Sequence, residues 1–428
     1  MADILEALCN AGFSAYLCGF SAIDSWLGRE KQIGTQVLTN ADVSDLARLF
    51  FYFFYPGIDL ADAALDEKNR TWYFRCMDSV RDNHPSFRLL EFYQDYKSRV
   101  FYDPRGIYPM LAGIRRNVHV TRKAKVIDTV IETDPLEIFR EGINRDCEHC
   151  RILMDAALIL AKYFPPDTGT QRQIKEITDF FSNIERCSIE RCSIDKCNIK
   201  EGGSQKNNLL DGAAPSQEEQ RILLSSLLVS PNPGLGLELL KVSGFIKKFW
   251  PELAILDEAD HSKEFHPEGN AWKHTMETFR YRKGVSDLRL SLGLLLHDSG
   301  KPIAVSANSR RFDGHAELGE VQAHRFLGRL GFGASLINDV CFLVRNHMLP
   351  AALPRLPFSR TAWIMASPLF PTLMELYRCD ESSSFKGLDG YYESSAVYQS
   401  YLRNCRNPYR SADGKKLNRK QISGSVKF

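Results

Sequence analysis

Histidine and aspartate side chains that could bind a metal ion are concentrated in a short part of this sequence. Seven of the ten histidines lie between His261 and His347, less than a quarter of the chain. The candidate ligands in and just after this stretch are His274, His297, Asp298, His315, His347 and Asp380. Imidazole and carboxylate groups suit Zn, Fe, Mn or Ni, so the set predicts a divalent-metal site without selecting one metal.

The segment around His297 gives the sharpest indication of chemistry. The apolar run Leu292–Leu296 has helical character and ends abruptly at His297-Asp298. A buried carboxylate at a helix end needs a partner for its charge, and a divalent cation would supply one. Gly300 permits a tight turn, and Lys301 adds a cation that could hold an anionic substrate. The alternative is that each histidine is an ordinary core residue and Asp298 a helix cap.

The order of these residues resembles the H…HD…D pattern of the HD superfamily of metal-dependent phosphohydrolases. The matching positions are His274, His297, Asp298 and Asp380. The resemblance implies an all-helical domain that hydrolyses phosphate esters, with Asp298 and Lys301 as its catalytic residues. Some members carry two further histidines and a second metal, and His315 and His347 stand at those places. The metal would be Mg, Mn, Ni, Fe or Zn.

Four segments narrow the resemblance to one family. FHPEGNAWKHTMETF, LLLHDSGKP, FDGHAELGEVQAHRFLGRLGF and LVRNHM resemble the HD domain of bacterial tRNA nucleotidyltransferases, which are CCA-adding enzymes of the poly(A) polymerase-like family. The segment upstream, GFIKKFWPEL, resembles that family's approach to its HD domain, and ADGKKL resembles a segment beyond it. The resemblance covers most of the chain, is specific in the HD half, and implies a nucleotidyltransferase head at the N-terminus.

The head keeps the family's scaffold positions. The family's GGxVRD motif falls on Ala15–Gly28, where Gly19 and Asp24 remain but Phe20 and Ile23 replace a glycine and an arginine. The family's RRDFTIN falls on residues 84–90, spaced correctly from Asp103-Pro-Arg-Gly106. Further along, EDPxRxxR falls on Thr133–Arg140. A folded head is therefore expected.

The head departs from the family at the positions that carry chemistry. The carboxylates of the DxD motif are replaced by Gly34 and Gln36, and Glu137 stands where the family uses an arginine to read the incoming base. Nucleotidyl transfer needs carboxylates to hold Mg²⁺ against the triphosphate. We therefore expect no cofactor at the degenerate positions Gly19, Gly34, Gln36 and Glu137, and we expect that transfer activity is lost.

Three hypotheses for function follow. The first is a metal-dependent phosphohydrolase that acts on nucleotides or RNA ends, 2′,3′-cyclic phosphates included. The second is retained nucleotide transfer to RNA 3′ ends with displaced carboxylates, for which Asp24, Asp42 and Asp45 are candidates. The third is an RNA-binding protein without catalysis. The substrate would be a nucleotide or RNA, with tRNA as a further partner, and the oligomeric state stays open.

The elements that must position these residues predict an α+β protein. Residues 1–130 form a small mixed α/β head, with strands expected near Ala15–Cys18, Gln36–Leu38, Thr71–Arg75 and Arg99–Tyr102. Residues 131–260 form a helical neck, in which helices are expected to start at Asp134-Pro135, to cover Met154–Tyr163, and to start near Ser216 with a capping box. An all-α HD domain spans residues 261–400, and residues 401–428 form a basic tail.

Three cysteine pentads interrupt the neck. Residues 185–199 read ERCSI-ERCSI-DKCNI, which places Cys187, Cys192 and Cys197 five residues apart. On a helix this period does not keep the cysteines on one face, and zinc sites usually pair cysteines two to four residues apart. A duplicated surface insertion near residues 185–215 is therefore favoured over a metal or redox cluster, or a short β-solenoid. The single Cys147-Glu-His-Cys150 is a weak signal with no second pair.

Composition describes an ordinary folded protein with an uneven charge. The 428 residues include 55 basic and 53 acidic side chains and have a net charge of +2. Residues 403–428 hold eight basic side chains and one acidic, a charge of +7, which leaves −5 for the rest. The tail could contact a phosphate backbone or be a solvated terminus. With no apolar run long enough to span a bilayer and no signal peptide, we expect a cytoplasmic protein without membrane contact and with reduced cysteines.

Overall fold

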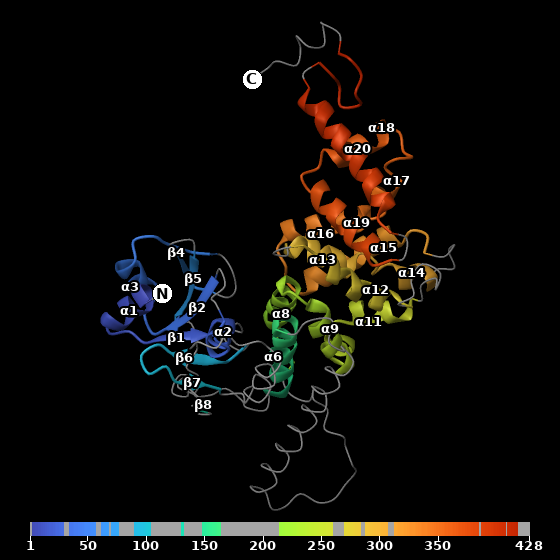
Figure 1. Cartoon of the computed structure of the whole chain (residues 1–428). Helices are drawn as coiled ribbons and strands as arrows, with labels where there is room; N and C mark the ends of the chain where they lie inside the picture. Colours follow the sequence, from blue (N-terminus) through green and yellow to red (C-terminus); the bar gives the residue numbers. More distant parts are fainter. Residues whose placement is uncertain are drawn as a thin grey trace, which may run out of the picture. The chain divides into compact units, whose positions relative to one another are not determined.

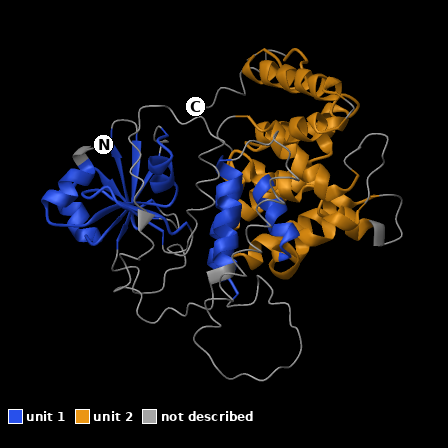
Figure 2. Ribbon diagram, turned by 60° about the horizontal axis from the view of Figure 1, so that its bottom comes forward, with its two compact units in different colours: residues 1–227, 235–244 blue, residues 228–234, 245–428 orange. Residues whose placement is uncertain are grey.

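A computed structural model of the chain describes most of its residues. The described ranges are 2–29, 34–56, 61–67, 70–76, 90–103, 130–131, 148–163, 214–259, 269–283, 287–306, 312–384, 387–407 and 409–417. Several predicted features lie outside them: Glu137, the helix start at Asp134-Pro135, residues 84–89, Cys147, and the three cysteine pentads. The chain divides into two compact units (Figure 2), residues 1–227 with 235–244, and residues 228–234 with 245–428.

The first unit contains a mixed eight-stranded sheet (Figure 1). Its strand order is β3-β4-β5-β2-β1-β6-β7-β8, and the pairs β2–β5 and β7–β8 are parallel while the others are antiparallel. The strands are β1 (Ala15–Cys18), β2 (Gly34–Thr39), β3 (Phe53–Phe54), β4 (Ala63–Glu67), β5 (Arg70–Cys76), β6 (Tyr93–Asp95), β7 (Phe101–Tyr102) and β8 (Val130–Ile131). The described strands lie in the predicted head, apart from the last residue of β8, so the α/β character of that part is confirmed.

Three short helices belong to this sheet: α1 (Ala2–Asn10), α2 (Phe20–Trp26) and α3 (Val43–Leu49). Gly19 precedes α2 with a φ of 54°, a left-handed conformation that suits glycine. Asp42 and Asp45 form a reciprocal capping box at the start of α3, since each carboxylate accepts from the other residue's backbone N–H. In this structure both carboxylates, which are candidates for displaced catalytic residues, are engaged at the start of a helix.

Helix α6 (Glu148–Tyr163) is attached to the head through Asp24. The hydroxyl of Tyr163 donates to Asp24 Oδ1 at 2.8 Å, and Lys162 Nζ lies 3.2 Å from Oδ2. Asp24 is 4% exposed. A buried carboxylate held by two donors from another helix is a structural anchor, and this is the environment of the third candidate for a displaced catalytic carboxylate.

Helices α8 (Gln217–Val229) and α9 (Pro233–Val242) follow. The Ser216 hydroxyl accepts a hydrogen bond from the Glu219 backbone N–H, and the Glu219 carboxylate accepts one from the Ser216 backbone N–H. These two bonds confirm the predicted capping box. The expected helix over Met154–Tyr163 is confirmed too, and it begins six residues earlier, at Glu148.

The rest of the second unit is helical. Its α-helices are α10 (Phe245–Phe249), α11 (Pro251–Ala254), α12 (Ala271–Thr278), α13 (Leu288–Leu296), α14 (Lys301–Ser306), α15 (His315–Arg329), α16 (Ala334–Asn346), α17 (Leu349–Ala352), α18 (Phe358–Met365), α19 (Phe370–Ser382) and α20 (Asp389–Arg406), with 3₁₀ turns at Ile255–Glu258 and Phe279–Tyr281. Because α20 runs to Arg406, the expected start of a tail at residue 401 lies inside a helix. The four-part domain division remains a prediction.

Helix α13 is the core of this unit and fixes where the site lies. Every residue from Leu290 to Leu296 is buried, and the helix packs against α16 and α19. An added Cβ on Gly300, just beyond the helix, would lie 2.0 Å from the carbonyl oxygen of His315. Gly300 lies in the turn that follows α13, as expected, and the close approach of α15 leaves no room there for a side chain.

Candidate metal centre

Six side chains predicted as metal ligands converge on one place in the second unit. Helix α12 provides His274, the end of α13 provides His297 and Asp298, and α19 provides Asp380. His315 begins α15, and His347 directly follows α16. Two groups of three form there, each with ligand atoms within 4.8 Å of one another.

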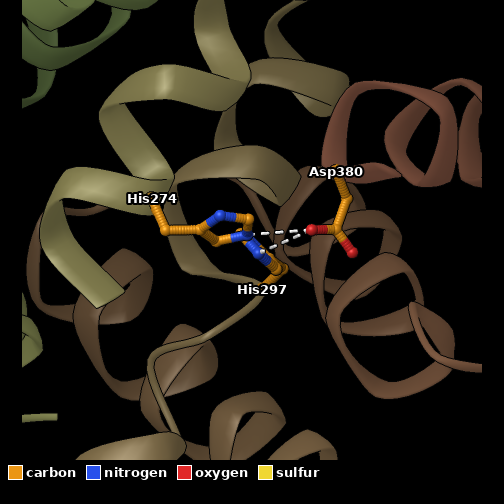
Figure 3. A group of neighbouring side chains, drawn as sticks. All are labelled: His274, His297 and Asp380. Atoms are coloured by element: carbon orange, nitrogen blue, oxygen red, sulfur yellow. Dashed lines mark hydrogen bonds and ion pairs between the residues drawn. The ribbon is translucent and has the colours of Figure 1, made fainter. Parts of the chain in front are cut away.

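The first group consists of His274, His297 and Asp380 and is called the His274 group (Figure 3). The Nε2 atom of His274 lies 2.8 Å from Asp380 Oδ1, and the Nε2 atom of His297 lies 3.9 Å from the same oxygen. Both histidines are 1% exposed. Figure 3 shows both rings directed toward the carboxylate.

The second group consists of Asp298, His315 and His347 and is called the Asp298 group. Asp298 Oδ1 lies 3.9 Å from His315 Nε2 and 4.0 Å from His347 Nε2. The two Nε2 atoms are 3.1 Å apart. The other oxygen of Asp298, Oδ2, lies 3.4 Å from His297 Nε2, so this carboxylate stands between the two groups.

Backbone carbonyls orient three of the four imidazoles. The Nδ1 atoms of His297, His315 and His347 lie 2.8, 2.8 and 2.7 Å from the carbonyl oxygens of Leu294, Phe312 and Val344, three residues earlier in each case. A carbonyl only accepts, so Nδ1 carries the proton and, in the neutral ring, Nε2 presents a lone pair. This arrangement is typical of metal-binding histidines.

The Nε2 atoms of His297, His315 and His347 face the interior of the site. His315 and His347 present two lone pairs to each other at 3.1 Å, which is unfavourable unless a proton or metal ion lies between them. Among the described residues, the Nε2 atom of His297 is one of two buried side-chain nitrogen or oxygen atoms without a hydrogen-bond partner. The donor set therefore fits a divalent metal, and its mixture of imidazole and carboxylate does not select one metal.

Electrostatics keep these groups in the protonation states that bind metals. Burial raises the pKa of Asp298, but the nearby His297 and Lys301 together lower it by more. The pKa therefore lies well below its ordinary value of 3.8. Burial, followed by the proximity of His297, lowers the pKa of His347 to about 3. Burial also lowers the pKa of His315. The carboxylate is thus ionised and the two imidazoles are neutral.

Lys301 lies beside the Asp298 group. Its Nζ is 2.7 Å from Asp298 Oδ2 and 5.4 Å from the centre of the Phe312 ring. Lys301 also lines a cavity of about 150 Å³. The cavity is lined by His274, Asp298, Lys301, His347, Met348, Ala351, Tyr377, Asp380, Glu381 and Ser384.

Five of these lining residues were not predicted from the sequence: Met348, Ala351, Tyr377, Glu381 and Ser384. Tyr377, Asp380, Glu381 and Ser384 follow one another at spacings of three, one and three residues in and just after α19, so they share one helix face. That spacing around the expected ligand Asp380 is a signal that could have identified three of the five.

Three of the four degenerate positions of the head, Gly19, Gly34 and Gln36, lie in the described part of the first unit. The Oε1 atom of Gln36 would be 2.7 Å from a Cβ on Gly19, and a Cβ on Gly34 would meet the Tyr73 ring at 2.9 Å. Gly34 and Gln36 are two residues apart on β2 and face the same side of the sheet. Neither offers a carboxylate, and Tyr73 occupies the space that a side chain at position 34 would need.

Comparisons with known proteins point to one family, although no family model matches the chain. The CC-adding tRNA nucleotidyltransferase of Thermus thermophilus is 33% identical over 184 residues, which are 39% of this chain and 40% of the relative. The multifunctional CCA protein of Halorhodospira halophila is 29% identical over 140 residues, 32% of this chain and 33% of the relative. The chain thus spans two fifths or less of the length of the curated relatives it matches.

Solved structures give low similarity scores. A CCA-adding enzyme in complex with ATP has a TM-score of 0.42 at 13% identity. The match covers 99% of this chain and 85% of the chain of that enzyme. A tRNA nucleotidyltransferase with a primer tRNA and an incoming ATP analogue has a TM-score of 0.35 at 11% identity, covering 94% of this chain and 98% of its own.

The sequence relatives confirm the predicted family resemblance. Their names favour nucleotide transfer, the second of the three hypotheses, and say nothing of phosphate-ester hydrolysis. Among the described helices, none is long and apolar enough to cross a membrane. Over its aligned part, the chain is therefore similar in sequence to CCA-adding tRNA nucleotidyltransferases.

Proposed function

We propose that this chain is a divalent-metal-dependent phosphohydrolase whose centre is formed by the His274 and Asp298 groups. The observation that carries the proposal is the pair of Nε2 atoms of His315 and His347, which face each other at 3.1 Å with both Nδ1 protons engaged by carbonyls. Neutral imidazoles in this arrangement need a cation between them, and Asp298 supplies the negative charge beside it.

The two groups divide the work of holding metal. His274, His297 and Asp380 would hold one ion, and Asp298, His315 and His347 would hold a second. Asp298 borders both, so it would keep them at a fixed separation. A bound divalent cation supplies Lewis acidity: it lowers the pKa of a water molecule and neutralises the charge that develops on the phosphoryl oxygens.

The other residues of the cavity bind and orient substrate. Lys301, the lysine that lines the cavity, attracts a phosphate and holds the Asp298 carboxylate in place. The volume of about 150 Å³ is below the range typical of sites for drug-sized ligands. A phosphate together with one group esterified to it fills the cavity. Nucleotides, 2′,3′-cyclic phosphates and phosphorylated RNA ends are substrates of this kind.

Hydrolysis assays test this proposal. The purified full-length protein is supplied with Mn²⁺, Ni²⁺ or Mg²⁺ and assayed on 2′,3′-cyclic AMP and on p-nitrophenyl phosphate. We expect metal-dependent turnover that is lost in Asp298→Ala and kept in Asp339→Ala, a partly exposed carboxylate that forms an ion pair with Arg289 on the same unit. Absence of turnover in the wild-type protein, or equal turnover in Asp298→Ala, would refute the proposal.

The second candidate is nucleotide transfer to tRNA, which the names of the sequence relatives favour. Against it stand Gly34 and Gln36, which bring no carboxylate to β2, and Tyr73, which fills the space beside Gly34. Because transfer needs carboxylates to hold Mg²⁺, we infer that the head has lost this activity. Incorporation of labelled CTP or ATP into tRNA by the full-length protein would establish the second candidate.

A further inference from the structure

A run of six aromatic residues forms one edge of the sheet in the first unit. Residues 50–55 read FFYFFY, and they include β3, the outermost strand at one end of the sheet. On one side β3 pairs with β4, where Phe53 lies opposite Leu65 and Phe54 opposite Ala64. Among the described strands, none pairs with its other side. That side of β3 is therefore an edge to which a further strand can add.

Part of the aromatic run is used by the fold. The ring of Phe50 stacks on the ring of the buried Phe74, with centres 5.8 Å apart. Phe53 is partly buried. These two residues attach the run to the first unit, so the outward direction of its other side chains is fixed by the fold.

The other four aromatic side chains are exposed and are called the β3 patch. Phe51, Tyr52 and Tyr55 are 92%, 73% and 71% exposed, and Phe54 is exposed as well. The rings of Phe51 and Tyr52 pack edge to face with centres 5.1 Å apart, and Tyr55 packs in the same way on Phe53 at 5.3 Å. Single exposed aromatic residues are ordinary on a protein surface, but four together mark a surface that binds a partner.

Charge decides which partner fits the β3 patch. Residues 49–55 contain no charged side chain, whereas edge strands of soluble proteins are usually protected by charges. A nucleic acid needs basic side chains near its phosphates, and this run has none. A second copy of the same patch can face the first across a two-fold axis without repulsion between like charges.

The size of the patch agrees with a weak dimer. At roughly 200 Å² for a fully exposed aromatic side chain, the four residues present on the order of 500 Å² in each copy. Two copies would together remove about 1,000 Å² from water, which is near the lower limit for a specific interface. An interface of this size predicts reversible association with a Kd on the order of micromolar.

We propose that two copies of this chain associate through their β3 edges, with the aromatic side chains of the two β3 patches packed against each other. The inference concerns the first unit and does not depend on the proposed hydrolase function. It assigns an oligomeric state, which the sequence left open, to a defined surface.

Sedimentation velocity of the full-length protein tests the inference over a range of about 1 to 200 µM, which spans the expected Kd. The wild-type protein should shift from monomer to dimer. Phe51→Lys and Tyr55→Lys each bring like charges together in the dimer, so each should weaken association on the order of 100-fold. Both positions are exposed, so both variants should fold, which circular dichroism checks. Backbone amide exchange in residues 51–54 of the wild type should slow several-fold as the concentration rises.

The matched control is Tyr409→Lys, at an exposed tyrosine of the second unit, which should dimerise like the wild type. A wild-type protein that is monomeric throughout the range would overturn the inference. Dimerisation that is unchanged in Phe51→Lys and Tyr55→Lys, or equally weakened in Tyr409→Lys, would also overturn it. A monomer that sediments with phosphatidylcholine vesicles, and no longer does so in Phe51→Lys, would replace the second copy by a membrane surface.

Discussion

At the scale of single residues, hydrogen bonds to backbone carbonyls decide what the candidate centre can bind. The carbonyls of Leu294, Phe312 and Val344 fix which nitrogen of each nearby imidazole carries the proton. The lone pairs of the other nitrogens then converge on Asp298 and Asp380. Such convergence is costly without a cation, which is why we read the cluster as a metal site rather than as part of the core.

Replacing Asp298 by Asn tests the carboxylate between the two groups. The side chain keeps its size but loses its charge, so metal affinity and hydrolysis should each fall on the order of 100-fold or more. Titration with Mn²⁺ and initial rates at saturating substrate measure the two effects. Asp339→Asn is the matched control. Unchanged metal affinity in Asp298→Asn would contradict the role given to this carboxylate.

At the scale of helices and strands, the close contact between α15 and the segment after α13 holds His315 near Asp298. A Cβ at position 300 would lie 2.0 Å from one backbone atom of α15 and 2.5 Å from another. Backbone cannot move aside as a flexible side chain can. The geometry of the Asp298 group therefore depends on a residue with no side chain.

Gly300→Ala should separate these two elements. We expect the free energy of unfolding to fall by about 3 kcal/mol, with weaker Mn²⁺ binding because His315 is displaced. The control is Gly328→Ala, in α15. Nothing lies within 4 Å of a Cβ added at this position, so the substitution should be neutral or stabilise the protein by up to about 1 kcal/mol. Equal urea unfolding midpoints for Gly300→Ala and the wild type would show that the contact is not tight.

An ion pair between α11 and α15 predicts a pH dependence. Arg329 binds both carboxylate oxygens of Glu252, at 2.9 and 2.6 Å. Burial raises the pKa of Glu252, but the bonds from Arg329 outweigh it, so the pKa lies below the ordinary value of 4.5. A lowered pKa stabilises the folded protein above pH 4.5, and this contribution is lost as the pH falls further.

Glu252→Gln should therefore lower the free energy of unfolding by about 2 kcal/mol at pH 7. The difference from the wild type should shrink as the pH falls below about 4.5. Urea unfolding of both proteins at pH 7 and at lower pH measures this. A difference that stays constant with pH would rule out the charged pair as its source.

Local patterns predicted several elements correctly. The apolar spacing of Met154–Tyr163, the capping box at Ser216 and the apolar run before His297 all correspond to helix features. Asp42 and Asp45, which were considered only as candidate catalytic carboxylates, also form a capping box. That pattern was visible in the sequence, since two acidic residues three apart before an apolar residue are typical of a helix start.

Other features depend on tertiary contacts and could not be predicted locally. The two-residue strands β3 and β8 are held by their neighbours in the sheet, and their own propensity is too weak to identify them, whereas β7 was expected near Arg99–Tyr102. The pairing of Asp24 with Tyr163 joins residues 139 apart in sequence. At the site, family resemblance indicated the ligands, but the contribution of Glu381 to the cavity required the packing of α19.

At the scale of the whole molecule, the chain combines two units with separate cores. The sheet and its helices bury residues such as Leu38 and Phe74, while the second unit buries α13. The candidate metal groups described by the structure lie in the second unit. Ligand binding to one unit should therefore leave the stability of the other unchanged.

Calorimetry with and without metal tests this independence. Mn²⁺ at about 100 times its dissociation constant should stabilise the unit that binds it by about 2.7 kcal/mol and raise one transition by roughly 5 °C. The other transition should not move, and Asp298→Asn should lose the shift. A shift of both transitions by the same amount would mean that the two units unfold together.

The most direct test of the central claim is the metal content of the purified wild-type protein beside Asp298→Asn, measured by inductively coupled plasma mass spectrometry after dialysis. We predict between one and two equivalents of a divalent metal per wild-type chain, falling well below one in Asp298→Asn. A wild-type protein that retains no metal after preparation with Mn²⁺, Ni²⁺ or Zn²⁺, or a variant that retains as much as the wild type, would contradict the account.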